Sequence, residues 1–486
     1  MLFGPPWRTW VAYSGFEDGP ARWPFVAFRW LERRNLDFVG FADQFPLGVR
    51  QPMRRREPPV DIPPGIANAS PGMFHRTNSP APGRPQAGRR ALLAALALTV
   101  ALAPARADPA PAAGGFDQFI AGLWPAAQAE GVSRKTFDTA TKGLHFDPKI
   151  AAHTQRQAEF LVPVWTYLAG AVLPARIVAG RKQYAALHDV LARASRVYGV
   201  DASAIMGAWG VETEFGAFFG GENVLDALAT LGFMHYQGDF GRDELLAALR
   251  ILEEGDVPPG GMRGSWAGAM GQPQFLPTSF LKYAVDFDGD GKRDIWRSKA
   301  DSLGSIAHFL AAHGWTAGLP WAIEVTLPAK YTFDAADFSG ERSFAEFAKK
   351  GVRAADASAL PKAGAARLYM PAGAQGPILL VTHNFDVIKT YNNSNAYVLA
   401  VGLLGDAIVG RGQLRTAWPT HAHVLTEAEV KTVQTELKAL GFEIGDIDGR
   451  AGPKLEQAIR TFQFMKGLTP DGYASPALLA RLKAPT

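Results

Sequence analysis

One apolar stretch, residues 202–216, constrains the fold of this chain more than any other feature. Its residues are almost all apolar or small, and two glutamates, Glu212 and Glu214, interrupt it near its C-terminal glycine. Glu214 lies about 200° around a helix from Glu212 and cannot share its face. The helical neighbours of Glu212, three and four positions away, are Ala208, Trp209, Phe215 and Gly216. The pattern therefore predicts a largely buried helix that carries Glu212 on an apolar stripe, with Asp201 or Ser203 as its N-cap.

The apolar surroundings decide what Glu212 can do. A carboxyl group that gives up a proton at neutral pH needs a raised pKa, and an apolar wall raises that pKa by disfavouring the charged form. Glu212 is therefore the candidate general acid of the chain. A structural carboxylate satisfied by hydrogen bonds would produce the same local pattern, so this stretch alone leaves both interpretations open.

Two further blocks, Ser265–Pro277 and Tyr391–Tyr397, follow downstream. Together with Trp209–Gly216 they resemble, in the same order, the lytic murein transglycosylases of the membrane-bound type B family. These are lysozyme-like enzymes that cleave bacterial cell-wall glycan. The resemblance runs from about Phe116 to about Gly410. It implies an α+β, mainly helical fold with a lysozyme-like catalytic domain. Within it, the short β-like runs 322–327 and 377–382, separated by Pro, Gly and Asp and interrupted by a helix around 344–350, predict a small α/β lobe inserted at about residues 318–389.

The resemblance also implies roles for individual residues. Glu212 would be the catalytic acid, Ser265 would hold Glu212 or the sugar, Met270 would line the glycan groove, and Gln274 would donate its amide to the glycan. The remaining implied sugar contacts are Tyr167, Tyr391, Asn392 and Tyr397. Phe309 stands where relatives often carry a groove tyrosine. Each block also has a purely structural interpretation, since Tyr167 suits a core, the glycines of 265–277 suit helix packing, and 391–395 suits an Asn-rich turn.

A run of alternating aspartates follows the second block. Asp286, Asp288, Asp290 and Asp294 occupy loop positions one, three, five and nine, with glycine at six, which is the pattern of an oxygen cage for a hard cation. The twelfth position is Arg297 rather than the glutamate that closes such loops. Relatives carry an EF-hand-like loop here, so Asp301 closes a longer loop in this interpretation. The predicted ligands of a structural calcium or sodium ion are Asp286, Asp288, Asp290, Lys292 and Asp301. A turn of solvated aspartates is the alternative, and no cofactor is expected for the chemistry.

The start of the chain predicts export. Arg89–Arg90 precede the apolar run Ala91–Ala103 and the small-residue site at 105–107, which is typical of a secretory signal peptide and too short to span a bilayer. We therefore expect a cleaved signal peptide at 88–107 and a mature periplasmic chain from Asp108. Because the signal is internal, Met73 is the expected start and residues 1–72 an overlong gene model. Residues 1–87 show no sustained helical or strand period and are expected to have no folded role.

Composition narrows the partners. The whole chain carries a formal net charge of +4, but residues 1–107 hold 14 arginines and 7 acidic residues, which leaves −3 for residues 108–486. A basic N-terminal arm for nucleic acid or anionic lipid thus loses its main support, and no nucleic-acid partner is expected. The absence of cysteine excludes disulfides, thiolate metal sites and a lipid-modified N-terminal cysteine.

The 486 residues exceed one ordinary domain, and the pattern divides them. A catalytic domain at 108–412 and a linker at 413–423 precede a compact module at 424–484. In this module Thr426 and Glu429 form a capping box, and Ser475–Pro476 begin the last of three helices. The module resembles the three-helix peptidoglycan-binding domain of wall enzymes; a helical bundle of unknown purpose is the alternative.

The family resemblance implies the chemistry. A single acid suffices if the substrate supplies the nucleophile. Glu212 would protonate the glycosidic oxygen between N-acetylmuramic acid and N-acetylglucosamine and then act as a base on the muramoyl C6 hydroxyl. The product would be a 1,6-anhydro end. A hydrolytic muramidase and a non-catalytic wall-binding protein are the alternatives. The expected partners are glycan strands and cell-wall synthases such as penicillin-binding proteins, and a monomer is expected.

Overall fold

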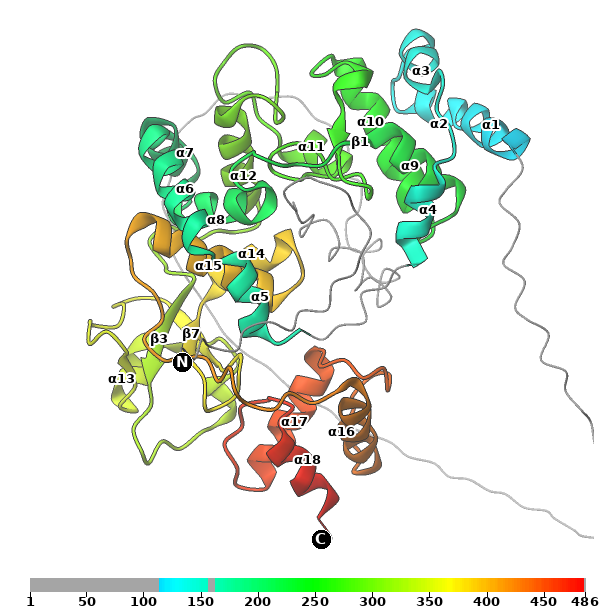
Figure 1. The fold of residues 1–486 in the computed structure, drawn as a ribbon. Coiled ribbons are helices and arrows are strands. Elements are labelled where there is room, and N and C mark those ends of the chain that lie inside the picture. The colour runs from blue at the N-terminus through cyan, green and yellow to red at the C-terminus, as the bar shows by residue number, and fades with distance from the viewer. Residues whose placement is uncertain (1–112, 156–161, 485–486) are drawn as a thin grey trace, which may run out of the picture. The chain divides into compact units, whose positions relative to one another are not determined.

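The computed structural model of the protein describes residues 113–155 and 162–484 (Figure 1). The expected leader at 88–107, the N-terminal extension and the segment Gln157–Phe160 lie outside the described residues. Within the described ranges, no helix combines the length and the apolar character needed to cross a membrane.

Helices make up most of the catalytic region. Seven precede the Glu212 stretch: α1 (Ala113–Gly122), α2 (Trp124–Ala129), α3 (Arg134–Thr141), α4 (Pro148–Gln155), α5 (Val164–Ala171), α6 (Pro174–Ala186) and α7 (His188–Tyr198). The following helices surround the site: α8 (Ala202–Thr213), α9 (Val224–Phe233), α10 (Phe240–Glu254), α11 (Pro277–Tyr283), α12 (Lys299–Ala312), α14 (His383–Tyr391) and α15 (Asn395–Val409). A short antiparallel pair, β1 (Glu222–Asn223) with β2 (Arg263–Gly264), joins the chain after α8 to the start of the Ser265 block.

Helix α8 carries Glu212 and is the buried helix that the sequence predicts. Asp201 caps its N-terminus by accepting a hydrogen bond from the backbone N–H of Ser203 at 2.9 Å. The helix ends at Thr213, three residues before the predicted glycine. Glu214 and Phe215 take left-handed backbone conformations with φ of 53° and 63°. These conformations turn the chain back, so that the Phe215 ring meets the Trp209 ring edge-on at 5.6 Å.

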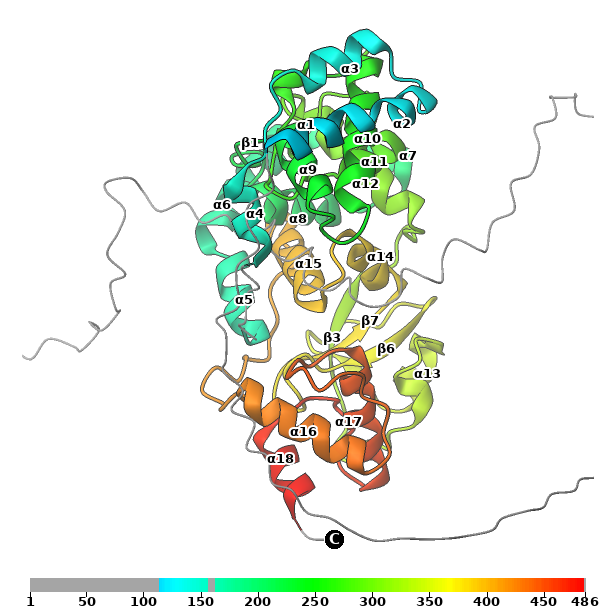
Figure 2. The same ribbon diagram turned by 90° about the vertical axis from the view of Figure 1, so that its right-hand side faces the viewer.

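Close backbone packing joins α8 to α15, and the two helices lie side by side in Figures 1 and 2. A Cβ atom on Gly207 would lie 2.0 Å from the carbonyl oxygen of Val401, and one on Gly405 would lie 2.1 Å from that of Ser203. Only glycine permits this approach. The contact brings the N-terminal turn of α15, which carries Tyr397, to the C-terminal turn of α8, which carries Glu212.

The expected α/β lobe lies between α12 and α14. Its five strands pair antiparallel in the order β4-β6-β7-β3-β5. Helix α13 (Phe344–Lys349) begins with a capping box between Ser343 and Glu346. The strand bounds are β3 (Ala322–Thr326), β4 (Arg342–Ser343), β5 (Arg353–Ala354), β6 (Ala365–Tyr369) and β7 (Ile378–Val381). The sequence predicts β3, β7 and α13, and the structure adds the other strands.

The C-terminal module consists of α16 (Glu427–Ala439), α17 (Pro453–Met465) and α18 (Pro476–Lys483) around a hydrophobic core of its own. The predicted capping box is present, since Thr426 and Glu429 exchange backbone-to-side-chain hydrogen bonds. Ser475 caps α18, whose first residue is proline. The mainly helical α+β fold class is thereby confirmed.

Candidate active site

Glu212 lies in the last turn of α8, with 7% of its surface exposed. Burial among apolar neighbours raises the pKa of its carboxyl to about 8, because the low-dielectric surroundings disfavour the carboxylate. The hydroxyl of Tyr397 donates a hydrogen bond to Glu212 Oε1 at 2.6 Å and acts in the opposite direction, favouring the charged form. At neutral pH Glu212 is therefore a protonated acid with a fixed donor at one oxygen.

Two tyrosines form the wall beside the acid. Tyr397 and Tyr391 stack with ring centroids 6.2 Å apart and planes inclined by 20°. The Tyr391 hydroxyl donates to the backbone carbonyl of Pro273 at 2.7 Å, which ties this wall to the second block. Burial raises the pKa of both hydroxyls well above the ordinary value, so both remain donors. Tyr397, predicted as a sugar contact, is 1% exposed and contacts the acid instead.

No second carboxylate acts on Glu212 within the described ranges, where burial and Tyr397 are the causes of its pKa shift. Two acidic residues that follow α8 have other partners. Asp226 accepts from the backbone N–H of His145 at 3.2 Å. Glu244 accepts from the backbone N–H and the hydroxyl of Thr278 at 2.9 and 2.8 Å, which secures the start of α11. Among the described residues, Glu212 is therefore a single acid at this site, with Tyr397 rather than a second carboxylate as its hydrogen-bond partner.

The expected side chains of the block at 265–277 make their contacts within the protein. Ser265 is buried, and its hydroxyl accepts from the backbone N–H of Ala269 at 3.1 Å. Met270 is 0% exposed and belongs to the hydrophobic core. The expectation that Met270 lines a sugar groove is therefore not supported, because a side chain without exposed surface cannot contact a ligand.

Gln274 is half-buried and adopts a left-handed conformation with φ of 55°. Its Nε2 atom donates to the carbonyl oxygens of Phe219 at 3.0 Å and Gly271 at 2.9 Å. An amide nitrogen has two hydrogens, so both donors of Gln274 are used within the protein. This differs from the expectation that Gln274 donates to the glycan, because only its oxygen remains for a ligand.

The other expected contacts surround this centre. Tyr167 lies half-buried on α5, and Asn392 is buried directly after α14. Phe309 is 7% exposed, and its ring packs against the Tyr391 ring at 4.7 Å, so it supports the tyrosine wall from behind.

Gln272 is a site residue that the sequence reasoning missed. Its side chain is buried between α8 and the segment after the aspartate loop, and it bonds to both. The available signal was a long polar residue flanked by glycine and proline in a block of small residues.

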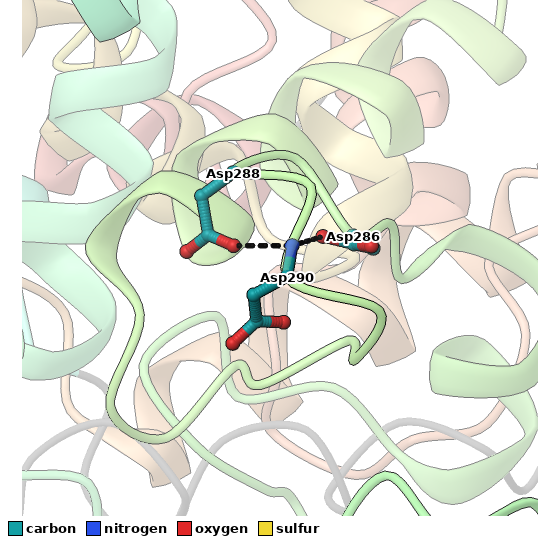
Figure 3. A group of neighbouring side chains, drawn as sticks. All are labelled: Asp286, Asp288 and Asp290. Atoms are coloured by element: carbon teal, nitrogen blue, oxygen red, sulfur yellow. Dashed lines mark hydrogen bonds between the residues drawn. The ribbon is translucent and has the colours of Figure 1, made fainter.

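The aspartate loop brings Asp286, Asp288 and Asp290 together, with one oxygen of each within 4.8 Å of the others (Figure 3). Asp286 also accepts from the backbone N–H groups of Gly289 at 2.7 Å and Gly291 at 2.8 Å. Asp288 accepts from the hydroxyl of Ser298 at 2.6 Å. The oxygens suit a hard cation, and the same hydrogen bonds would also hold the loop without one.

Asp301 does not join this group. It is fully buried, and its two oxygens accept from the backbone N–H groups of Phe287 at 2.7 Å, Asp288 at 3.1 Å and Asp294 at 2.8 Å. The expectation that Asp301 is a ligand is corrected, because its oxygens face the loop backbone rather than the other aspartates. Lys292 donates its backbone N–H to Asp290 Oδ1 at 2.9 Å.

Comparison with known proteins decides the family. The family model described as "Transglycosylase SLT domain" matches residues 115–406, which hold Glu212, both tyrosines and the Gln274 block. The chain belongs to this transglycosylase family. A peptidoglycan binding domain family matches residues 426–482, which contain α16, α17 and all of α18 except its last residue. The resemblance drawn from the three sequence blocks is thereby confirmed.

Individual relatives of the SLT transglycosylase family agree. The membrane-bound lytic murein transglycosylase B of Escherichia coli K12 is 35% identical over 221 residues, which span 45% of this chain and 60% of the relative. SltB3 from Pseudomonas aeruginosa, solved in complex with NAG-anhNAM-pentapeptide, is 44% identical with a TM-score of 0.70 over 76% of this chain and 99% of its own. The Escherichia coli lytic transglycosylase Slt35, solved in complex with calcium, is 29% identical with a TM-score of 0.52, covering 62% and 94%. The lysozyme-like class of the catalytic fold is confirmed by these structures.

Proposed function

We propose that this protein is a lytic transglycosylase that cleaves the β-1,4 bond between N-acetylmuramic acid and N-acetylglucosamine in peptidoglycan. One observation carries the proposal: Glu212 is a buried acid with a pKa of about 8, and no second carboxylate acts on it within the described residues. Most glycosidases that use water rely on a pair of carboxyl groups. A site with a single acid suits a reaction in which the substrate supplies the nucleophile.

The proposed reaction uses Glu212 twice. Its protonated carboxyl donates a proton to the glycosidic oxygen, so that the bond from muramoyl C1 to that oxygen breaks and N-acetylglucosamine leaves with a free hydroxyl. The carboxylate then accepts the proton of the muramoyl C6 hydroxyl while the C6 oxygen forms a bond to C1. The product is a 1,6-anhydromuramoyl end, no water is consumed, and Glu212 is protonated again.

Tyr397 serves both steps in this proposal. Its hydroxyl, 2.6 Å from Glu212 Oε1, stabilises the carboxylate that exists between the two proton transfers. The same bond fixes the rotamer of Glu212. The structure of SltB3 with NAG-anhNAM-pentapeptide supports the assignment of an anhydro product, because that ligand contains an anhydro-muramoyl end.

The test is the Glu212→Gln variant assayed on purified sacculi by mass spectrometry of the soluble products. We expect the wild type to release anhydro products and the variant to release none while still sedimenting with sacculi. A hydrolytic muramidase would release products heavier by one water, and a non-catalytic wall-binding protein would release none in the wild type either. Retained turnover in the Glu212→Gln variant would refute the assignment of the acid.

The other features extend the proposal. The C-terminal module would hold the enzyme on glycan strands, as its family match suggests. The arginine pair and apolar run of residues 89–103 support export to the periplasm in this proposal, with cell-wall synthases as partners there and a monomer as the working form. Asp286, Asp288, Asp290 and the backbone carbonyl of Lys292 would hold a calcium or sodium ion that stabilises the loop. That Slt35 was solved in complex with calcium supports the choice of this cation.

A further inference from the structure

Gln272 occupies a buried position in which each of its four polar atoms has a hydrogen-bond partner. Its Oε1 accepts from the indole N–H of Trp209 at 3.0 Å, and its Nε2 donates to the carbonyl of Trp296 at 3.1 Å. Its backbone N–H donates to the carbonyl of Ile295 at 2.9 Å, and its carbonyl accepts from the hydroxyl of Thr213 at 2.9 Å. Only 3% of its surface is exposed.

Two of these bonds connect Gln272 to α8, one on each side of Glu212 along the chain. Trp209 precedes Glu212 by three residues, nearly one helical turn, and Thr213 directly follows it. A third contact lies just beyond the helix, where a Cβ atom on Gly216 would lie 2.3 Å from Gln272 Oε1. The last turn of α8 and the turn at residues 214–216 therefore both pack against Gln272.

The other end of the amide rests on a rigid support. Ile295 and Trp296 follow the aspartate loop, and the carbonyl of Ile295 also accepts from the hydroxyl of Ser302 on α12 at 3.0 Å. The indole N–H of Trp296 donates to the carbonyl of Arg263 at 2.8 Å. Gln272 therefore connects the end of the catalytic helix to a segment that is itself held at two points.

From these contacts we infer that Gln272 is a positioning residue, which holds the last turn of α8 so that the Glu212 carboxyl stays aligned with Tyr397 and sealed from water. The inference rests on the proposed role of Glu212 as the acid. A displacement of about 1 Å in a reacting group can reduce a rate a hundredfold, so a small movement of this turn has a large effect. Substrate binding depends on other residues, so the effect falls on kcat rather than on KM.

The test replaces Gln272 by methionine, which keeps the length of the side chain and removes its hydrogen bonds. In the full-length protein acting on soluble glycan strands, we expect kcat to fall roughly ten- to a hundredfold with little change in KM. Water reaching the loosened site would lower the pKa of Glu212, so the alkaline limb of the pH–rate profile should move to lower pH. Trp209→Phe removes the donor from the same bond, and the double variant should lose less than the product of the two single losses.

Asn384→Leu is the matched control. Asn384 is a buried amide that accepts from the backbone N–H of Thr316 at 2.8 Å and donates to the carbonyl of Thr316 at 2.9 Å and of Leu319 at 2.6 Å, away from the acid. We expect it to lower the melting temperature comparably while leaving kcat and the alkaline limb unchanged. If Gln272→Met does not fold, Thr213→Val is the milder substitute, because it removes only the hydroxyl that donates to the Gln272 carbonyl. It should also lower kcat.

A Gln272→Met or, failing that, a Thr213→Val enzyme that melts earlier but keeps the wild-type kcat and alkaline limb would overturn the inference, because only a structural role would remain. The proposed function fails separately: it falls if Glu212→Gln still forms anhydro products. If Glu212→Gln is inactive and Gln272→Met is fully active, the acid stands and the positioning role does not.

Discussion

Replacing Tyr397 by phenylalanine tests how the acid is tuned. The substitution keeps the stacked ring and removes the hydroxyl that donates to Glu212 Oε1 at 2.6 Å. Because that bond favours the carboxylate, its loss should raise the pKa of Glu212 above its value of about 8. Glu212 would then remain protonated to higher pH, and the alkaline limb of kcat against pH should move upward.

The size of the effect follows from the bond. A buried hydrogen bond to a charged group contributes about 1.5–3 kcal/mol, and 1.36 kcal/mol corresponds to a pKa shift of one unit. The alkaline limb of the pH–rate profile should therefore move by roughly one to two pH units. The substitution also removes the same stabilisation from the Glu212 carboxylate that exists between the two proton transfers. Formation of this carboxylate should therefore slow about ten- to a hundredfold at neutral pH.

The assay is chromatography of anhydro products from soluble glycan strands between pH 5 and 10, with Tyr391→Phe as the control. Tyr391 donates to the carbonyl of Pro273 rather than to Glu212, so its variant should leave the limb closer to the wild-type position. A Tyr397→Phe limb that stays in place or moves to lower pH would refute the reasoning, because it would mean that the hydroxyl does not stabilise the carboxylate.

Three further predictions concern stability. The raised pKa of Glu212 means that the unfolded chain binds fewer protons at this residue than the folded chain between about pH 4.5 and 8. The contribution of Glu212 to the free energy of unfolding should therefore decline as pH rises through that range. The melting-temperature difference between wild type and Glu212→Gln should change with pH accordingly, and a constant difference would contradict this. Gly207→Ala should destabilise the protein by about 1–3 kcal/mol in urea unfolding, because its Cβ would lie 2.0 Å from the Val401 carbonyl. Gly170→Ala is the control, because Gly170 is also helical and has open space around its Cβ, so it tests the helix backbone effect alone. Asp301→Ala should lower the unfolding free energy by several kcal/mol with or without chelator, since it leaves three loop N–H groups unpaired, whereas Asp286→Asn should reduce the melting-temperature gain from added calcium. An Asp286→Asn protein with the full calcium response would exclude the proposed ion site.

Local features of this protein could be predicted from the sequence because they depend on neighbours along the chain. The buried helix around Glu212 follows from an apolar run, and the caps at Asp201 and Thr426 follow from side chains that bond within two or three residues. Strands β3 and β7 follow from β-branched apolar runs between turn residues. The end of α8 was misjudged because Glu214 and Phe215, rather than the glycine alone, adopt the left-handed conformation.

The site itself was decided by tertiary structure. Glu212 and Tyr397 are 185 residues apart, and only the glycine-mediated approach of α8 and α15 makes the hydroxyl a partner of the acid. The sequence shows that Met270 and Gln274 belong to the second block, but it does not show that Met270 packs into the core or that Gln274 donates to the Phe219 carbonyl. A sequence determines which chemical groups a segment carries. Which atoms those groups meet, and how far water is excluded from them, depends on packing between distant segments, and this packing sets the pKa of Glu212.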